Sequence, residues 1–216
     1  MTAPVLLVVT AVSAEAEAVR AGADPTGIRV EPVGVGPAAA AAGTARLLAL
    51  AEAAGTPYRA VLSAGIGGGF PGRAPVGATV LGRRAIAADL GAESADGFLP
   101  IEQLGFGTST VEADEALFKT LLAALPGAVH GDILTLATVT GTAATAAALT
   151  ARFPDAVAEA MEGYGVACAA AGTGTPFAEL RTVSNPVGPR DRGAWRLREA
   201  LTALTTSAHA LSRVTA

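Results

Sequence analysis

Met161 and Glu162 stand in a segment that combines a charged side chain with unusually apolar surroundings. The run reads AEAMEGYGVACAAAG, in which most neighbours are small and apolar. A carboxylate in such a run is rarely left unpaired, because burying an isolated charge is costly. Sugar hydroxyls are one kind of partner that the carboxylate of Glu162 could bind.

A second polar group follows one apolar helix later, in the sequence RTVSN that begins at Arg181. Arg181 lies inside an apolar strand pattern, so its burial also needs a partner. Asn185 closes this strand, because Pro186 favours extended geometry before it and ends the ladder of hydrogen bonds. Asn185 is explained equally well as a turn residue.

Polar residues also follow two earlier strands. Glu15 comes just after the first expected strand, and Ser63 to Gly65 close the third. Ligands of open α/β sheets gather at the carboxyl ends of strands, so these residues and Asn185 are predicted to meet in one crevice. The competing interpretation is that Glu15 and Glu17 are only first-turn acids favoured by the helix dipole.

The hydrophobic pattern predicts alternating strands and helices. Strands are expected at residues 5–9, 27–33, 59–64, 77–86, 133–138 and 177–184, and helices at 14–20, 37–54, 111–125, 142–152, 163–171 and 193–213. This order predicts a single α/β domain over residues 1–216, a three-layer αβα sandwich with a mixed and strongly bent central sheet. Residues 89–110 form an irregular stretch, and loops of that length are usually functional.

Composition argues against several classes of protein. The net charge is −4 with scattered basic residues, so we expect no nucleic-acid partner. Cys168 is the one cysteine, which excludes an internal disulfide or a multi-cysteine metal site and fits a reducing cytoplasm. The first apolar run reads as a strand rather than a signal peptide, and the longest apolar block is too interrupted to span a membrane.

Two enzyme classes also fit poorly. A dinucleotide fold needs its glycine cluster directly after the first strand, whereas Gly34 and Gly36 follow the second. Ser63 lacks the G-x-S-x-G elbow, and His130 and His209 have no helpful spacing for a serine hydrolase triad.

Six motifs together resemble the purine nucleosidase and phosphorylase superfamily, in its methylthioadenosine nucleosidase-like branch. They are TAVSAEAEAV at Thr10, GVGPAAAAAG at Gly34, SAGIGGG at Ser63, PVGATV at Pro75, FPDAVAEAMEG at Phe153 and RTVSN at Arg181. Within that branch, the segment VSNPVGPRDRGAW is similar to the futalosine hydrolases. The resemblance implies a cofactor-free enzyme that acts on a small nucleoside and releases hypoxanthine, in the alternative menaquinone pathway.

The resemblance also implies roles around the sugar. Glu162 matches the carboxylate that receives the ribose 2′- and 3′-hydroxyls, and Met161 matches the residue on the sugar face. Glu15 matches the base that activates water, with Glu17 as a weaker candidate. Ser63 and Arg181 match residues that line the site of the water, and Gly65 belongs to the same substrate-binding segment.

On the purine side, Asn185 falls where methylthioadenosine nucleosidases place an Asp. Val139 and Thr140 fall where that branch has a base-stacking Phe and its neighbour, so the stacking residue is replaced here. An amide can donate to O6 of a 6-oxopurine and accept from N7–H, whereas an ionised Asp would face the O6 lone pairs. Asn185 therefore predicts a preference for hypoxanthine nucleosides over adenine nucleosides.

Futalosine carries a distal benzoate, for which Arg190 or Arg192 could provide a bidentate partner. A solvated loop charge is the equally simple interpretation of both arginines. The resemblance further implies a homodimer.

Three rival functions remain at this point. One is a methylthioadenosine or adenosylhomocysteine nucleosidase. Another is a purine nucleoside phosphorylase, whose anion site could recruit Arg83, Arg84 and the glycines at 34 and 67. The third is a nucleoside-binding protein without catalytic activity.

Overall fold

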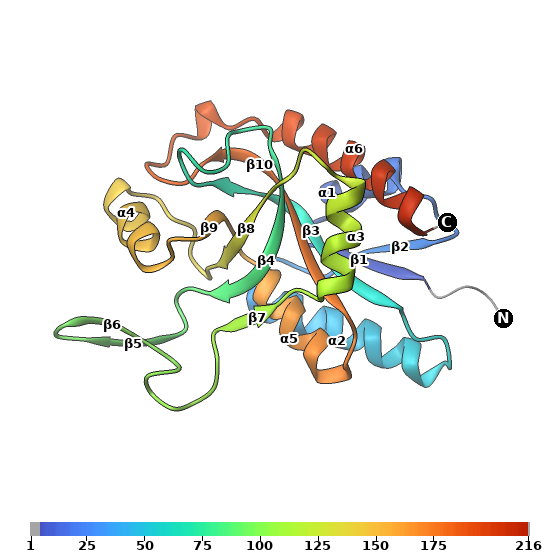
Figure 1. Ribbon diagram of the computed structural model, residues 1–216, viewed down its shortest axis with the longest axis horizontal. Helices are drawn as coiled ribbons and strands as arrows, with labels where there is room; N and C mark the ends of the chain where they lie inside the picture. Colours follow the sequence, from blue (N-terminus) through green and yellow to red (C-terminus); the bar gives the residue numbers. More distant parts are fainter. Residues whose placement is uncertain (1–4, 216) are drawn as a thin grey trace.

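The computed structural model describes residues 5–215, which form one large β-sheet between two layers of helices and a separate small hairpin (Figure 1). The strands are β1 (Leu6–Thr10), β2 (Ile28–Pro32), β3 (Ala60–Gly69), β4 (Thr79–Ala87), β5 (Gly91–Ser94), β6 (Gly97–Pro100), β7 (Thr110–Glu112), β8 (Val129–Thr135), β9 (Ala156–Ala160) and β10 (Phe177–Pro186). The helices are α1 (Ser13–Gly22), α2 (Pro37–Ala53), α3 (Glu115–Ala124), α4 (Ala143–Arg152), α5 (Gly163–Thr173) and α6 (Leu197–Thr215), with a short 3₁₀ turn at Arg192–Ala194.

The main sheet is mixed and bends back on itself. Its order is β10-β4-β8-β9-β3-β1-β2, with β7 added beside β4. β3 also pairs with β10, so β3, β10, β4, β8 and β9 form a closed circuit of strands. β1, β2, β3 and β10 run parallel, while β4 pairs antiparallel to β10 and β9 antiparallel to β3. The predicted mixed α/β sheet is confirmed, and the bend is strong enough to close part of it.

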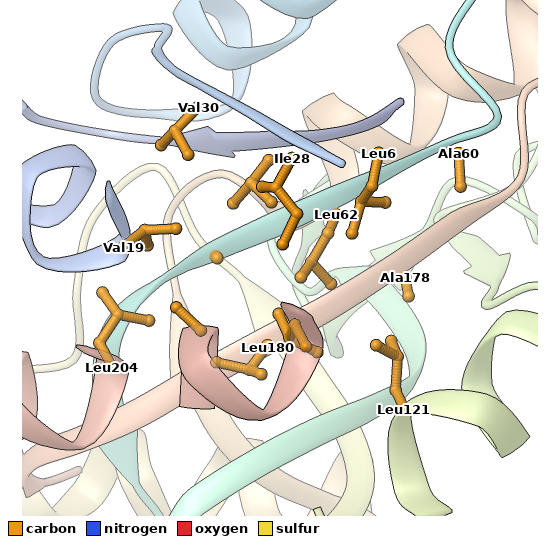
Figure 2. Packing of buried hydrophobic residues seen from close by; sticks show 14 of the residues in the cluster. Leu6, Val19, Ile28, Val30, Ala60, Leu62, Leu121, Ala178, Leu180 and Leu204 are labelled. Carbon is orange, nitrogen blue, oxygen red and sulfur yellow. The ribbon is translucent and has the colours of Figure 1, made fainter. Parts of the chain in front are cut away.

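Helices cover both faces of the sheet. On one face, α1, α3 and α6 pack against alternating residues of β1, β3 and β10. Figure 2 shows Leu62 of β3 and Leu180 of β10 on this face, with Leu204 of α6 packed in the same cluster. On the opposite face, α2 and α5 pack together over the intervening residues of the same strands, such as Val61 and Phe177. Because side chains alternate along each strand, every central strand is buried on both sides. This explains the continuous apolar runs in the sequence.

Several predicted boundaries were wrong. The glycines after Ala64 do not end the third strand, because β3 continues through Gly69 and uses them to pair with both β10 and β9. β9 was not predicted at all, and the predicted strand at 133–138 starts earlier and ends at Thr135. A helix was expected over residues 111–125, but the first residues of this range belong to strand β7 and the helix α3 begins only at Glu115.

The irregular stretch at 89–110 contains an arm that projects from the body of the molecule. β5 and β6 pair antiparallel and extend beyond the main sheet (Figure 1). Arg152 at the end of α4 lies over the ring of Phe98 in this arm, at 4.0 Å from its centroid. Phe106, just after the arm, is 80% exposed. Among the described residues, no helix is long and apolar enough to cross a membrane.

Candidate active site

Arg181 is the centre of a buried polar network at the middle of β10. Its side chain is only 1% exposed, yet all three nitrogen positions have partners. Nε donates to Glu179 Oε1 at 2.9 Å, Nη1 to Glu162 Oε2 at 3.1 Å and Nη2 to Ser63 Oγ at 3.0 Å. The planar guanidinium therefore fixes the relative positions of three side chains. The predicted burial of Arg181 with a partner is confirmed.

Glu162 lies at the junction between β9 and α5, where the chain leaves the sheet. Its second oxygen, Oε1, accepts a hydrogen bond from the backbone nitrogen of Gly36 at 3.2 Å. Gly36 has φ of +88° and is the residue that precedes α2, so the glycine loop before that helix positions the amide for Glu162. The carboxylate is thus held between Arg181 and the loop that precedes α2. Met161, next to it, is half-buried.

Glu15 is buried at the start of α1 and binds three backbone amides. Oε2 accepts from the nitrogens of Ala11 at 3.0 Å and Val12 at 3.3 Å, and Oε1 accepts from the nitrogen of Ile66 at 2.9 Å. A carboxylate has roughly four acceptor positions, so one remains on Oε1. The bonds from Ala11 and Val12 cap the helix, and the bond from Ile66 ties Glu15 to β3.

Gly65 permits the close approach of Glu15 and Arg181. A Cβ atom at position 65 would lie 2.6 Å from Glu15 Oε1 and 2.8 Å from Arg181 Nη1. Both groups therefore lie over the same point of β3. The structure brings Glu15, Ser63, Gly65, Glu162 and Arg181 together from four separate segments, which are α1, β3, the junction of β9 with α5, and β10.

Asn185 lies further along β10 at an irregularity in its pairing with β3, where the register shifts between Val183 and Asn185. Its Oδ1 accepts from Ser184 Oγ at 2.8 Å, and its Nδ2 donates to the carbonyl of Pro186 at 3.1 Å. The side chain is half-buried and passes beside Gly68 of β3. An amide has two donor hydrogens and two acceptor lone pairs, so one of each remains.

Thr140 is held by a buried carboxylate that the sequence reasoning did not single out. Glu159 of β9 accepts from the nitrogen of Thr140 at 2.7 Å and also from its hydroxyl. Burial raises the pKa of Glu159 above its ordinary value, and the two bonds from Thr140 oppose the change. The neighbouring Val139 is 39% exposed.

Arg190 connects the loop after Asn185 to the loop of Thr140, because its backbone nitrogen donates to the carbonyl of Gly141 at 3.2 Å. The guanidinium carbons of Arg190 and Arg192, which are both exposed, each lie 5.9 Å from the centroid of the Trp195 ring. The hydrogen bond to Gly141 joins the two loops, and the loop after Asn185 carries basic and aromatic groups beside it.

Glu179 is the second carboxylate that the sequence reasoning missed. It is 1% exposed, and burial raises its pKa to about 7 although Arg181 opposes the shift. A signal existed in the sequence, because side chains two apart on a strand share a face and Glu179 precedes Arg181 by two.

Other charged candidates lie elsewhere. Glu17 is exposed on α1. Arg84 pairs with Asp132, and Arg83 lies over the ring of Phe118, in a groove whose lining includes neither Glu15 nor Glu162. Among residues 5–215, no cluster of His, Cys, Asp or Glu is arranged to hold a metal ion.

The arrangement offers two chemically distinct ends. One end has carboxylates fixed by Arg181 and backbone amides, which suits hydroxyl groups and a developing positive charge. The other end has the free donor and acceptor of Asn185, which suits the edge of a heterocycle. Glu15, with one open acceptor position, is placed to take a proton.

Comparison with known proteins identifies the fold and the family of this chain. The family model described as "Phosphorylase superfamily" matches residues 15–216. The solved 5′-methylthioadenosine/S-adenosylhomocysteine nucleosidase of Neisseria meningitidis, in complex with methylthio-immucillin-A, aligns over 97% of both chains with a TM-score of 0.80 and 21% identity. The native structure of futalosine hydrolase from Helicobacter pylori also aligns over 97% of both chains, with a TM-score of 0.80 and 17% identity.

The fold and the family match define a member of the phosphorylase superfamily. Two curated relatives narrow the assignment. Futalosine hydrolase of Streptomyces coelicolor is 52% identical, covering 97% of this chain and 95% of that protein. Futalosine hydrolase of Acidothermus cellulolyticus is 45% identical, covering 90% of this chain and 85% of that protein. The chain belongs to the futalosine hydrolase family.

Proposed function

We propose that this chain hydrolyses the N-ribosidic bond of futalosine, releasing hypoxanthine and dehypoxanthine futalosine for menaquinone biosynthesis. The observation that carries the proposal is the Arg181 network, which holds Glu162 and Ser63 in place beside Glu15. It occurs in a chain 52% identical to a protein named futalosine hydrolase. The reaction needs no cofactor.

In this reaction the sugar develops positive charge as the bond to the purine breaks, and the purine develops negative charge. Glu162 accepts hydrogen bonds from the ribose 2′- and 3′-hydroxyls, and its charge stabilises the ribosyl cation. Met161 packs on the sugar face. Because Arg181 and Gly36 already hold the carboxylate, little reorganisation is needed during the reaction.

Glu15 accepts a proton from the attacking water through the open position on Oε1. Ser63, Gly65 and Arg181 line this part of the site, and the missing Cβ of Gly65 leaves room over β3. A positioned general base typically contributes about 10²- to 10⁴-fold to the rate. The water attacks the face of the ring opposite to the departing purine.

Asn185 binds the purine. Its remaining donor hydrogen suits O6 of hypoxanthine, and its remaining lone pair suits N7–H of the leaving group, which takes that proton from solvent while Glu15 returns the proton of the attacking water to solvent. Thr140 and Val139 flank the base, with Thr140 held by Glu159. The hydrogen bonds to Ser184 and Pro186 hold the amide of Asn185 in one orientation. In this orientation a 6-aminopurine presents a donor where Asn185 also presents one, so adenine nucleosides are disfavoured.

Arg190, in the loop beside Trp195, binds the distal carboxylate of the substrate. Its backbone is fixed by Gly141 while its guanidinium stays exposed, which suits a partner that arrives with the substrate. Replacement of Arg190 by Ala is expected to raise KM with little change in kcat. Unchanged KM in this variant, and in the matching variant at Arg192, contradicts this part of the proposal.

We also propose a cytoplasmic homodimer in which the β5–β6 arm contributes to the subunit contact. The arm projects from the body, and the exposed Phe106 lies beside it. Large exposed aromatic side chains near a projecting element are typical of subunit interfaces. Sedimentation of the wild-type protein and of Phe106→Ser tests this, and a monomeric wild-type protein contradicts it.

The decisive experiment is incubation with futalosine, inosine and methylthioadenosine, with and without phosphate, followed by chromatography of the freed bases. Hypoxanthine release from futalosine without phosphate supports hydrolysis. Release that depends on phosphate assigns a phosphorylase. Arg84, a candidate for the phosphate site of such an enzyme, is paired with Asp132. Preferential release of adenine assigns a methylthioadenosine nucleosidase, and binding without release assigns a binding protein.

A further inference from the structure

Glu179 is a buried carboxylate for which the proposed mechanism has no direct use. Its Oε1 accepts from Arg181 Nε, whereas its Oε2 has no hydrogen-bond partner among the described residues. Oε2 packs directly on the start of α5, since a Cβ atom on Gly163 would lie 2.0 Å from it. Burying a carboxylate with one unsatisfied oxygen costs free energy, and an apolar side chain at this position would avoid that cost.

Arg181 connects Glu179 to Glu162 and Ser63. The guanidinium is a rigid fork, so fixing Nε fixes the directions of both Nη groups. With Nε held by Glu179, Nη1 faces Glu162 and Nη2 faces Ser63. Without this bond, the guanidinium can rotate about the side-chain bonds of Arg181 and release Glu162 from the position that receives the sugar.

We infer that Glu179 is a positioning residue that acts through Arg181, fixing the orientation of Glu162 and supplying a negative charge behind the sugar. The inference rests on the proposed hydrolysis of a nucleoside. It assigns a function to a residue that need not touch the substrate itself.

The charge of Glu179 is set by few neighbours. Arg181 and Glu162 act on it directly, and Glu15 acts on Arg181. β3, which flanks β10, has no titratable side chain. The other titratable groups on the elements packed around β10 have partners elsewhere or lie at the surface. Tyr164 donates to the carbonyl of Thr108, Glu159 accepts from Thr140, Arg83 lies over Phe118 and Arg84 pairs with Asp132. The exposed ones are Cys168 on α5, Arg46 and Glu52 on α2, Glu115 and Lys119 on α3, and Arg198, Glu199 and His209 on α6.

A pH dependence follows from this environment. Burial raises the pKa of Glu179 to about 7, so its charge appears as the pH rises through neutrality. The added negative charge favours the ribosyl cation, and kcat should therefore rise across this range. Two unit charges roughly 10 Å apart at an effective dielectric constant of about 20 change a rate on the order of tenfold.

The test uses Glu179→Gln, which keeps an oxygen for Arg181 Nε and removes the charge. Glu179→Asp keeps the charge and shortens the side chain. Asp132→Asn is the matched control, because Asp132 is also a buried carboxylate paired with an arginine but lies in the separate groove at Arg84. For each protein, kcat and KM for hypoxanthine release from futalosine are measured from about pH 5.5 to about pH 9.

The Gln variant is expected to lose the rise in kcat near neutral pH and to fall on the order of tenfold below wild type at high pH, with KM within about twofold. The Asp variant keeps the rise at a lower kcat, and the Asn control keeps the wild-type profile. The inference is overturned if the Gln variant retains both the rise and the wild-type kcat, or if its kinetics match those of the control. If wild type releases no hypoxanthine from futalosine, the proposed function itself fails and this inference falls with it.

Discussion

Replacement of Glu15 by Gln separates a catalytic role from a purely structural one. Both carboxylate oxygens accept backbone N–H groups, from Ala11 and Val12 on one side and Ile66 on the other. The NH₂ of a glutamine must therefore face at least one backbone donor. The less costly orientation places NH₂ beside Ile66, which loses one hydrogen bond instead of two and removes the open acceptor position on Oε1.

The magnitudes follow from this geometry. Leaving one buried donor unsatisfied costs about 1–3 kcal/mol, which lowers the melting temperature by roughly 2–4 °C per kcal/mol in a chain of this size. Loss of the general base lowers kcat by about 10²- to 10⁴-fold. Hypoxanthine binding should change little, because Asn185 and the loop of Thr140 are untouched.

The assay combines thermal unfolding, calorimetric titration with hypoxanthine and chromatographic measurement of futalosine hydrolysis. Glu17→Gln is the matched control, since Glu17 lies on the same helix and is exposed. It should behave as wild type in all three measurements. A Glu15→Gln protein that is destabilised but retains kcat within about threefold of wild type refutes the catalytic role and leaves Glu15 as a helix cap only.

Three further outcomes are expected. Asn185→Asp should lower kcat/KM for futalosine by at least about 10²-fold in steady-state assays while affecting methylthioadenosine less; equal losses for both substrates contradict the purine-binding role. Gly163→Ala should lower the melting temperature strongly in calorimetry, because its Cβ would lie 2.0 Å from Glu179 Oε2; a wild-type melting temperature contradicts the packing. The pKa of Glu179 is about 7 when folded against an ordinary 4.5, so the folded state binds the proton more tightly. This contribution to stability is complete below about pH 4.5 and falls by about 3 kcal/mol as the pH rises through about 7. Denaturant unfolding of wild type should show this loss and Glu179→Gln should lack it; parallel curves contradict the assignment.

The parts of the site that follow from local patterns could be predicted from the sequence. Glu15 and Asn185 come at strand ends, and Arg181 interrupts an apolar strand, so each carries its own signal of a polar site. Glu162 stands out because its neighbours are small and apolar. The end of a strand and a charge in an apolar run can both be recognised from a few neighbouring residues. The structure brings Glu15, Glu162 and Arg181 close together, whereas Asn185 lies further along β10 and bonds to Ser184 and Pro186.

The closure of the sheet could not be predicted in the same way. It depends on the pairing of β3 with both β10 and β9, which joins segments about a hundred residues apart through a glycine run. Glycine has no side chain to carry an alternating pattern, so a glycine run in the sequence is typical of the end of a strand. The register that sets Glu179 beside Gly163 is likewise a property of the assembled sheet and not of either segment.

The most direct test of the central claim is the ratio of kcat/KM for futalosine to that for methylthioadenosine, measured with purified protein in buffer free of phosphate. The claim is that fixed carboxylates at Glu15 and Glu162 act on a ribose whose purine is bound by the amide of Asn185. It predicts phosphate-independent release of hypoxanthine and a ratio on the order of 10⁴. A ratio near one, or release of hypoxanthine only when phosphate is added, contradicts it.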